Sequence, residues 1–111
     1  MLKIEGTTIQ LTRSNTARIT VGIYDSDGNE YTVQDGDTVH FSVKKNAEDD
    51  EAVIDKDIDT TTMILEIDPD DTAELGMGDV YGRYEYDIDL IQNDGTKDTF
   101  ISGVLYILKE V

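Results

Sequence analysis

Polar and apolar residues alternate without a break in the stretch Arg83-Tyr84-Glu85-Tyr86-Asp87-Ile88-Asp89-Leu90. Because successive side chains of a β-strand point to opposite faces, this alternation predicts a strand with one buried and one wet face. Asn93-Asp94-Gly95 follows, and an Asp-Gly pair favours a hairpin turn. Residues 99–108 are the predicted return strand. Apolar residues occupy both of its faces, which predicts a central or covered position in a sheet.

Segments of the same period fill much of the remaining chain. They predict strands at residues 17–24, 30–33, 39–43, 52–58 and 63–67, with turns at 25–29, 35–37 and 59–62. The polar run at residues 44–51 is predicted to be an exposed loop. One short helical turn is expected at residues 68–75, since Asp68 is a good N-cap residue and Pro69 suits the first helical position.

The number and length of these segments predict an all-β fold. Seven to nine short strands with one short helical turn indicate an immunoglobulin-like antiparallel β-sandwich, and a small barrel is the alternative. The chain has 111 residues and shows no linker or internal repeat, so residues 1–111 are assigned to one domain. It has no cysteine, which excludes disulfides and thiolate chemistry.

The charge of the chain limits its partners. It has 25 Asp and Glu residues against 9 Lys and Arg residues, a formal net charge of −16. Such a surface repels phosphate groups, so neither nucleic acid nor an anionic membrane is an expected partner. No apolar run approaches the roughly 20 residues that span a bilayer, and the N-terminus lacks the features of a signal peptide. The missing signal peptide and apolar run favour a cytoplasmic location.

The residues that most resemble catalytic groups have a simpler explanation. His40 is the only histidine, and it is out of phase with the apolar residues around it, so it is predicted to point to solvent. A lone exposed histidine is a poor catalytic or metal centre. Asp87 and Asp89 share an outward face about 7 Å apart. A solvated acidic face is favoured over a glycosidase pair, which needs a cleft and two unequal environments. We therefore predict no catalytic residues and no enzyme activity.

One loop contains the type of oxygen ligands that calcium prefers. The run Asp25-Ser26-Asp27-Gly28-Asn29-Glu30 is acidic, but its spacing departs from the EF-hand pattern. A hairpin turn explains the same residues, and calcium binding stays the lesser alternative. No metal site and no cofactor are predicted.

The tyrosines divide into two pairs. Tyr84 and Tyr86 lie on the apolar face of their strand, so core packing is favoured over ligand stacking. Tyr24 and Tyr31 flank the early turn, and Tyr24 is predicted to point outward beside acids. Tyrosine is enriched at interface anchors, which makes Tyr24 and Tyr31 the candidate interaction residues. The alternative is that Tyr24 covers a neighbouring strand.

Several motifs follow one another in order: Tyr24 to Gly28, Phe41 to Lys44, Asp68 to Leu75, Gly82 to Leu90 with Asn93 to Gly95, and Ser102 to Leu105. Together they resemble the N-terminal sandwich domain of upper baseplate (tail) proteins of phages and prophages of Gram-positive hosts. The segment Gly76-Met77-Gly78-Asp79-Val80 departs from that family, which usually has a proline there. The resemblance implies a non-enzymatic structural or adaptor protein of a phage or prophage tail or baseplate. Its partners would be other tail and baseplate proteins, and its location would be the virion if it is expressed from a phage or prophage.

Two other classes of function stay open. The first is an acidic immunoglobulin-like binding module of a bacterial surface or secreted system, with or without calcium; the lack of a signal peptide counts against it. The second is an enzyme, which no convergent polar cluster in the sequence supports. Self-association into a homo-oligomer is also open, and the acidity is compatible with a halophilic habitat.

The net charge leads to a prediction about salt. A surface at −16 repels itself, and salt screens such repulsion over about 8 Å at physiological ionic strength. The melting temperature is therefore expected to rise between low salt and about 0.5 M sodium chloride. Thermal melts followed by circular dichroism measure this. A flat or falling melting temperature would show that the charges are too dispersed, or too well paired, to destabilise the folded chain.

Overall fold

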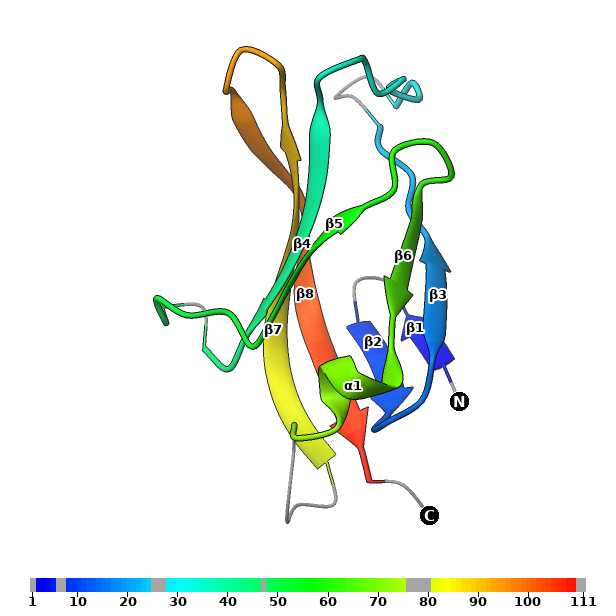
Figure 1. The fold of residues 1–111 in the computed structure, drawn as a ribbon, viewed down its shortest axis with the longest axis vertical. Coiled ribbons are helices and arrows are strands. Elements are labelled where there is room, and N and C mark those ends of the chain that lie inside the picture. Colours follow the sequence, from blue (N-terminus) through cyan, green and yellow to red (C-terminus); the bar gives the residue numbers. More distant parts are fainter. Residues whose placement is uncertain (1, 6–7, 25–27, 47, 76–80, 110–111) are drawn as a thin grey trace.

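The computed structural model describes residues 2–5, 8–24, 28–46, 48–75 and 81–109 (Figure 1). These residues form eight strands and one short helix. In chain order they are β1 (Leu2–Glu5), β2 (Thr8–Thr12), β3 (Ala17–Thr20), β4 (Thr38–Lys44), β5 (Ile54–Ile58), β6 (Ile64–Ile67), α1 (Pro69–Thr72), β7 (Tyr81–Ile91) and β8 (Lys97–Leu108). This confirms the predicted all-β class, the predicted number of strands and the predicted short helical turn. No helix in the described part of the chain is long and apolar enough to cross a membrane.

The strands form two sheets. Six of them make one sheet in the order β1-β2-β8-β7-β4-β5, and β3 and β6 make a two-stranded ribbon. The six-stranded sheet is open: among the described residues β1 and β5 each have a strand partner on one side only, so the barrel alternative is wrong. The expected central position of the last strand is confirmed, because β8 lies between β2 and β7.

The prediction of a purely antiparallel sheet is wrong. β2 runs parallel to β8, with Ile9 opposite Leu105 and Leu11 opposite Ile107. A tight turn forces antiparallel pairing, whereas strands far apart in the chain are free to pair in parallel. β2 and β8 lie near opposite ends of the chain, so no turn restricts the direction of their pairing. The structure also contains two strands, β1 and β2, in a part of the chain where the sequence analysis predicts none.

One hydrophobic core lies between the sheet and the ribbon. Inward-facing residues of β2, β4, β5, β7 and β8 meet those of β3, β6 and the segment after β3 in a single cluster. Its fully or nearly buried members are Ile9, Leu11, Ala17, Val21, Ile23, Val39, Phe41, Val43, Ile54, Ile58, Leu65, Ile67, Tyr84, Tyr86, Ile88, Leu90, Leu105 and Ile107. The predicted alternation in the strands therefore identifies the buried face correctly.

The early hairpin is shorter than predicted. Regular pairing of β3 ends at Thr20, although Val21 and Ile23 stay buried in the same phase. The predicted return strand at residues 30–33 is reduced to one bridge, Tyr24 to Glu30, and a bond from the Tyr31 N–H to the Ile23 carbonyl. The turn residues 25–27 lie outside the described residues.

The chain between residues 52 and 75 passes from one sheet to the other. The predicted strands at 52–58 and 63–67 are β5 and β6, which lie in different sheets. A turn at residues 59–63 joins them, and Met63 adopts a positive φ of 54° there. The predicted helical turn follows as α1, and the Asp68 N–H donates to Asp71 Oδ2 at 2.8 Å.

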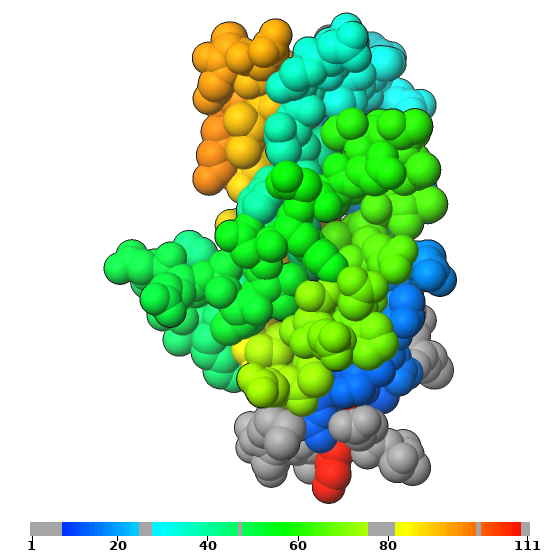
Figure 2. Space-filling view, in the orientation of Figure 1, coloured from blue at the N-terminus to red at the C-terminus, as the bar shows by residue number. Residues whose placement is uncertain are grey.

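Of the loop predicted at residues 44–51, Lys44 belongs to β4, and the described residues after it are exposed. Together with the start of the next segment it projects from one side of the molecule between β4 and β5 (Figure 2). Val53 in this region is 42% exposed. At the far end of β7, Gly95 turns the chain into β8 with a φ of 91°, a conformation that glycine adopts without strain.

The core makes a matched prediction about two aliphatic side chains. Leu105 in β8 has no exposed surface, so Leu105→Ala removes buried contacts and leaves a cavity. The free energy of unfolding in urea is expected to fall by about 2–5 kcal/mol. The control Val53→Ala changes an exposed side chain and is expected to cost no more than about 0.5 kcal/mol. Equal effects of the two substitutions would contradict this description of the core.

Candidate interaction surface

Tyr24 lies where its phase in the chain predicted. Val21 and Ile23 point into the core, and the Tyr24 side chain is 64% exposed. Its ring lies against Gly22: a Cβ atom on that glycine would be 3.1 Å from Tyr24 Cε2. Glycine at position 22 therefore lets the ring rest on the strand backbone. Tyr24 partly covers its own strand and still presents most of its surface to solvent.

Tyr31 has a different environment. It pairs across from Ile23 and is half-buried against the core. Its hydroxyl donates to Asp37 Oδ2 at 2.8 Å. The structure thus brings the two candidate tyrosines to the same short hairpin, but it does not place them on one exposed face.

Asp37 is the centre of a polar cluster that the sequence did not predict. Besides the Tyr31 hydroxyl, its carboxylate accepts the Gln34 N–H at 2.9 Å and the Asn93 N–H at 3.2 Å. The bond from the Gln34 N–H lowers the pKa of Asp37 most, followed by that from the Tyr31 hydroxyl. Gly36 has a φ of 88°, and a Cβ there would lie 2.8 Å from Asn93. The cluster therefore joins the loop after the early hairpin to the β7–β8 turn.

His40 lies on the face of β4 opposite to the buried residues, as its phase predicted, but it is not isolated there. Its imidazole is half-buried on β4, and its Nδ1 lies 2.7 Å from Asp57 Oδ1. Its Nε2 contacts Asp55 Oδ1. Burial lowers the pKa of His40, but the hydrogen bond to Asp57 and the charge of Asp55 outweigh it, and the pKa is raised overall. The sequence could not show these partners, because they depend on the strand register that places His40 opposite Asp57.

The prediction for Asp87 and Asp89 is half correct. Asp87 is exposed and accepts a hydrogen bond from the Ser102 hydroxyl at 2.6 Å. Asp89 is only 5% exposed; Thr99 Oγ1 donates to it at 2.5 Å, and Lys97 Nζ lies 3.6 Å away. A register shift between Ile88 and Asp89 changes which β8 residues face Asp89, so the predicted solvated pair is wrong for this residue. Both carboxylates bind side chains of β8.

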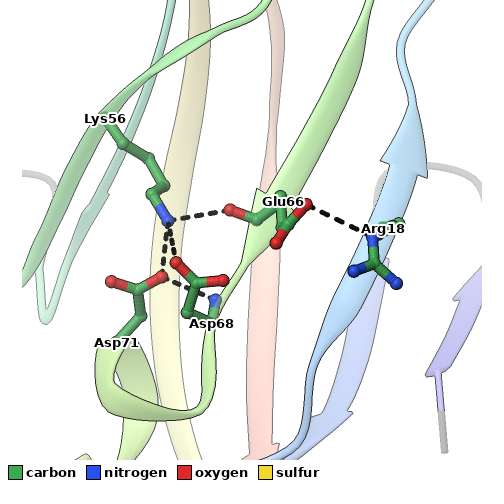
Figure 3. A network of polar contacts seen from close by, with 5 residues as sticks. All are labelled: Arg18, Lys56, Glu66, Asp68 and Asp71. Atoms are coloured by element: carbon green, nitrogen blue, oxygen red, sulfur yellow. Dashed lines mark hydrogen bonds and ion pairs between the residues drawn. The ribbon is translucent and has the colours of Figure 1, made fainter.

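Lys56 forms a polar connection between the two sheets (Figure 3). From the edge strand β5, its Nζ donates to Asp71 Oδ2 at 2.6 Å and to the Glu66 carbonyl at 2.8 Å, and lies 3.7 Å from Asp68 Oδ2. Arg18 of β3 pairs with the side chain of the same Glu66 at 3.2 Å. In the sequence, Lys56 stands out only as a lysine between two acids in the run Ile54-Asp55-Lys56-Asp57-Ile58. Its partners could not be predicted, because the fold brings them together.

Lys56, Arg18, Glu66 and Asp68 line an open hollow of about 430 Å³. Asp57, Asp59, Thr62 and Ile64 complete its wall. The lining contains more acidic than basic side chains, and both basic ones, Lys56 and Arg18, are paired with acids. The hollow is therefore polar and on balance acidic. In the part of the chain that the structure describes, no three His, Asp or Glu side chains converge as metal ligands. In the run considered as a lesser calcium alternative, residues 25–27 lie outside the described residues.

Tyr84 and Tyr86 confirm the prediction of core packing. They are 6% and 4% exposed. The Tyr86 ring lies 5.8 Å from that of Phe41 at an angle of 46°, and burial raises the pKa of its hydroxyl. Lys45 Nζ lies 4.7 Å from the centre of the Tyr84 ring, close enough for a cation–π contact.

Comparison with known proteins does not assign the chain to a family. No protein-family model matches it, and no curated protein matches it either.

His40 makes a prediction about pH. Because its pKa in the folded chain lies above the ordinary value of 6.5, its contacts with Asp55 and Asp57 stabilise the fold fully below that value. This stabilisation is lost as the pH rises through the raised pKa. The wild type should therefore have a higher free energy of unfolding than His40→Gln at about pH 6, by about 1 kcal/mol or less. This difference should be smallest at about pH 9. Urea unfolding at each pH measures the difference. A difference independent of pH would contradict this role.

Proposed function

We propose that this protein is a non-enzymatic adaptor of a phage or prophage tail or baseplate, which acts by protein–protein contact with other tail and baseplate proteins. The observation that carries the proposal is the position of Tyr24. In a small domain whose other large aromatic residues with described side chains are at least half-buried, its ring is 64% exposed. An exposed aromatic ring on a regular scaffold is a typical interface anchor.

The residues that resemble baseplate proteins fall on connected parts of the fold. Phe41 to Lys44 belong to β4, Gly82 to Leu90 to β7 and Ser102 to Leu105 to β8, which are neighbours in one sheet. Asp68 to Leu75 contain α1. The departure at residues 76–80 lies outside the described residues. This arrangement supports the proposal because the motifs belong to one structural unit.

The finer description of the fold belongs to the same proposal. An immunoglobulin-like sandwich accounts for two sheets that share one core, with a helical turn before the longest hairpin. In such domains a tyrosine near the start of the strand after the turn packs inward, and Tyr84 has that position. The small second sheet makes this a reduced version of the architecture.

Tyr24 has the properties of an anchor that does not depend on charge. Its ring rests on Gly22, which limits its freedom before binding. A tyrosine ring buries a large area at a low cost in side-chain entropy. The acid excess of the chain as a whole keeps the free protein soluble.

Co-purification tests the proposal. The tagged chain is co-expressed with each tail and baseplate protein encoded near its gene, and we expect it to retain at least one. Tyr24→Ser should weaken this retention at least tenfold, in the range of an interface hot spot. Tyr31→Phe keeps the half-buried ring and should retain the partner nearly as well.

Val53→Ser is the matched control, because it removes an exposed apolar side chain from the loop before β5. It should leave binding unchanged. The proposal is wrong if none of these proteins is retained. If a partner binds equally well to wild type and Tyr24→Ser, the adaptor function stands but the surface is misplaced.

A further inference from the structure

β3 forms one edge of the two-stranded ribbon. β3 pairs with β6 from Ala17–Ile67 to Thr20–Ile64, and among the described residues it has no strand partner on its other side. β3 lies at the margin of the molecule, with β6 between it and β5 (Figure 1). An unpaired strand edge presents backbone donors and acceptors that can bind another strand.

The hydrogen-bond phase identifies which groups point outward. The Val21 N–H donates to the Met63 carbonyl at 2.8 Å, so Val21 directs its backbone groups toward β6. Because these directions alternate along an antiparallel strand, the backbone groups of Arg18, Thr20 and Gly22 point to the open side. All three residues are exposed. We call this row of backbone groups the β3 edge.

The β3 edge lies in the part of the chain without acids. From Gly6 to Tyr24 there is no Asp or Glu, so all 25 acids of the chain lie outside this segment. The one charged side chain along the edge, Arg18, pairs with Glu66 at 3.2 Å. The opposite case is β5, the edge strand that carries Asp55 and Asp57. Charged side chains are the usual protection against strand pairing, and β3 has little of it.

We propose that the β3 edge pairs antiparallel with the same edge of a second copy of this chain. Two copies at −16 repel each other over most of their surfaces, but at this edge they can approach without placing acids face to face. A basic partner would instead be drawn to acid-rich surfaces such as the β5 edge. Charge distribution therefore favours a second copy as the occupant.

The pairing extends the ribbon into a four-stranded sheet across a twofold axis. The same patch serves both copies, as a closed dimer requires. The edge is short, about seven residues from Ala17 to Ile23, and mutual repulsion persists elsewhere. The dimer is therefore weak, and salt strengthens it by screening that repulsion.

Sedimentation equilibrium of the full chain tests the proposal. Over a concentration series the wild type should pass from the mass of a 12.4 kDa monomer to that of a dimer. Its dissociation constant should fall at least threefold between about 0.05 M and 0.5 M sodium chloride. A wild type that stays monomeric throughout, or that forms higher oligomers without a dimer, overturns the proposal.

Two variants locate the contact. Thr20→Pro removes an N–H that faces the open edge and spares the bonds to β6, a position where a strand tolerates proline. It should raise the dissociation constant at least tenfold while the circular dichroism spectrum stays that of the wild type. Arg18→Glu provides a second variant if Thr20→Pro fails to fold, because it places an acid on the edge. It should also weaken the dimer at least tenfold.

Lys109→Glu makes the same change of charge at an exposed residue after β8 and should shift the constant less than threefold. A dimer that survives both edge variants, or is weakened equally by Lys109→Glu, overturns the proposal. The proposal is independent of the adaptor function, since it requires no tail protein and a dimer could form whether or not one binds.

Discussion

Burial of one apolar layer between the six-stranded sheet and the β3–β6 ribbon is the constraint on which the rest of the structure depends. The chain has no disulfide to hold the layers together. A two-stranded ribbon is at best marginally stable alone, so β3 and β6 keep their pairing because Ala17, Leu65 and Ile67 are buried in the common core. Lys56 acts at the rim of this layer, where it joins β5 to β6 and α1. The acidic surface surrounds the core without contributing to it.

The elements that could be predicted are those defined by local sequence. β7 alternates regularly, and the Asp94-Gly95 turn leads directly into β8. β2 was missed, although Ile9 and Leu11 alternate with polar residues, because its pairing partner is almost a hundred residues away. Nothing near β2 in the chain specifies that this pairing is parallel. Asp89 shows a related effect, since it is buried against Thr99, which lies opposite it only because of a register shift in the β7–β8 pairing.

The candidate surface was predictable to a similar extent. The outward position of Tyr24 follows from the phase of Val21 and Ile23, which the core fixes. The inward position of Tyr31 depends on its bond to Asp37, which in turn accepts a bond from Asn93 in the β7–β8 turn. Only the folded chain brings these residues together. The contacts of His40 with β5 likewise depend on a register that the long loop before β5 does not determine.

Both proposals concern surfaces on the ribbon side, and they depend on the ribbon being a rigid part of the domain. Amide hydrogen exchange measured residue by residue tests this most directly. If the common core makes one cooperative unit, the amides of Leu65 and Ile67 in β6 should exchange only by global unfolding, with the same opening free energy as that of Leu105 in β8. Ribbon amides that exchange through openings several kcal/mol easier than global unfolding would contradict this account.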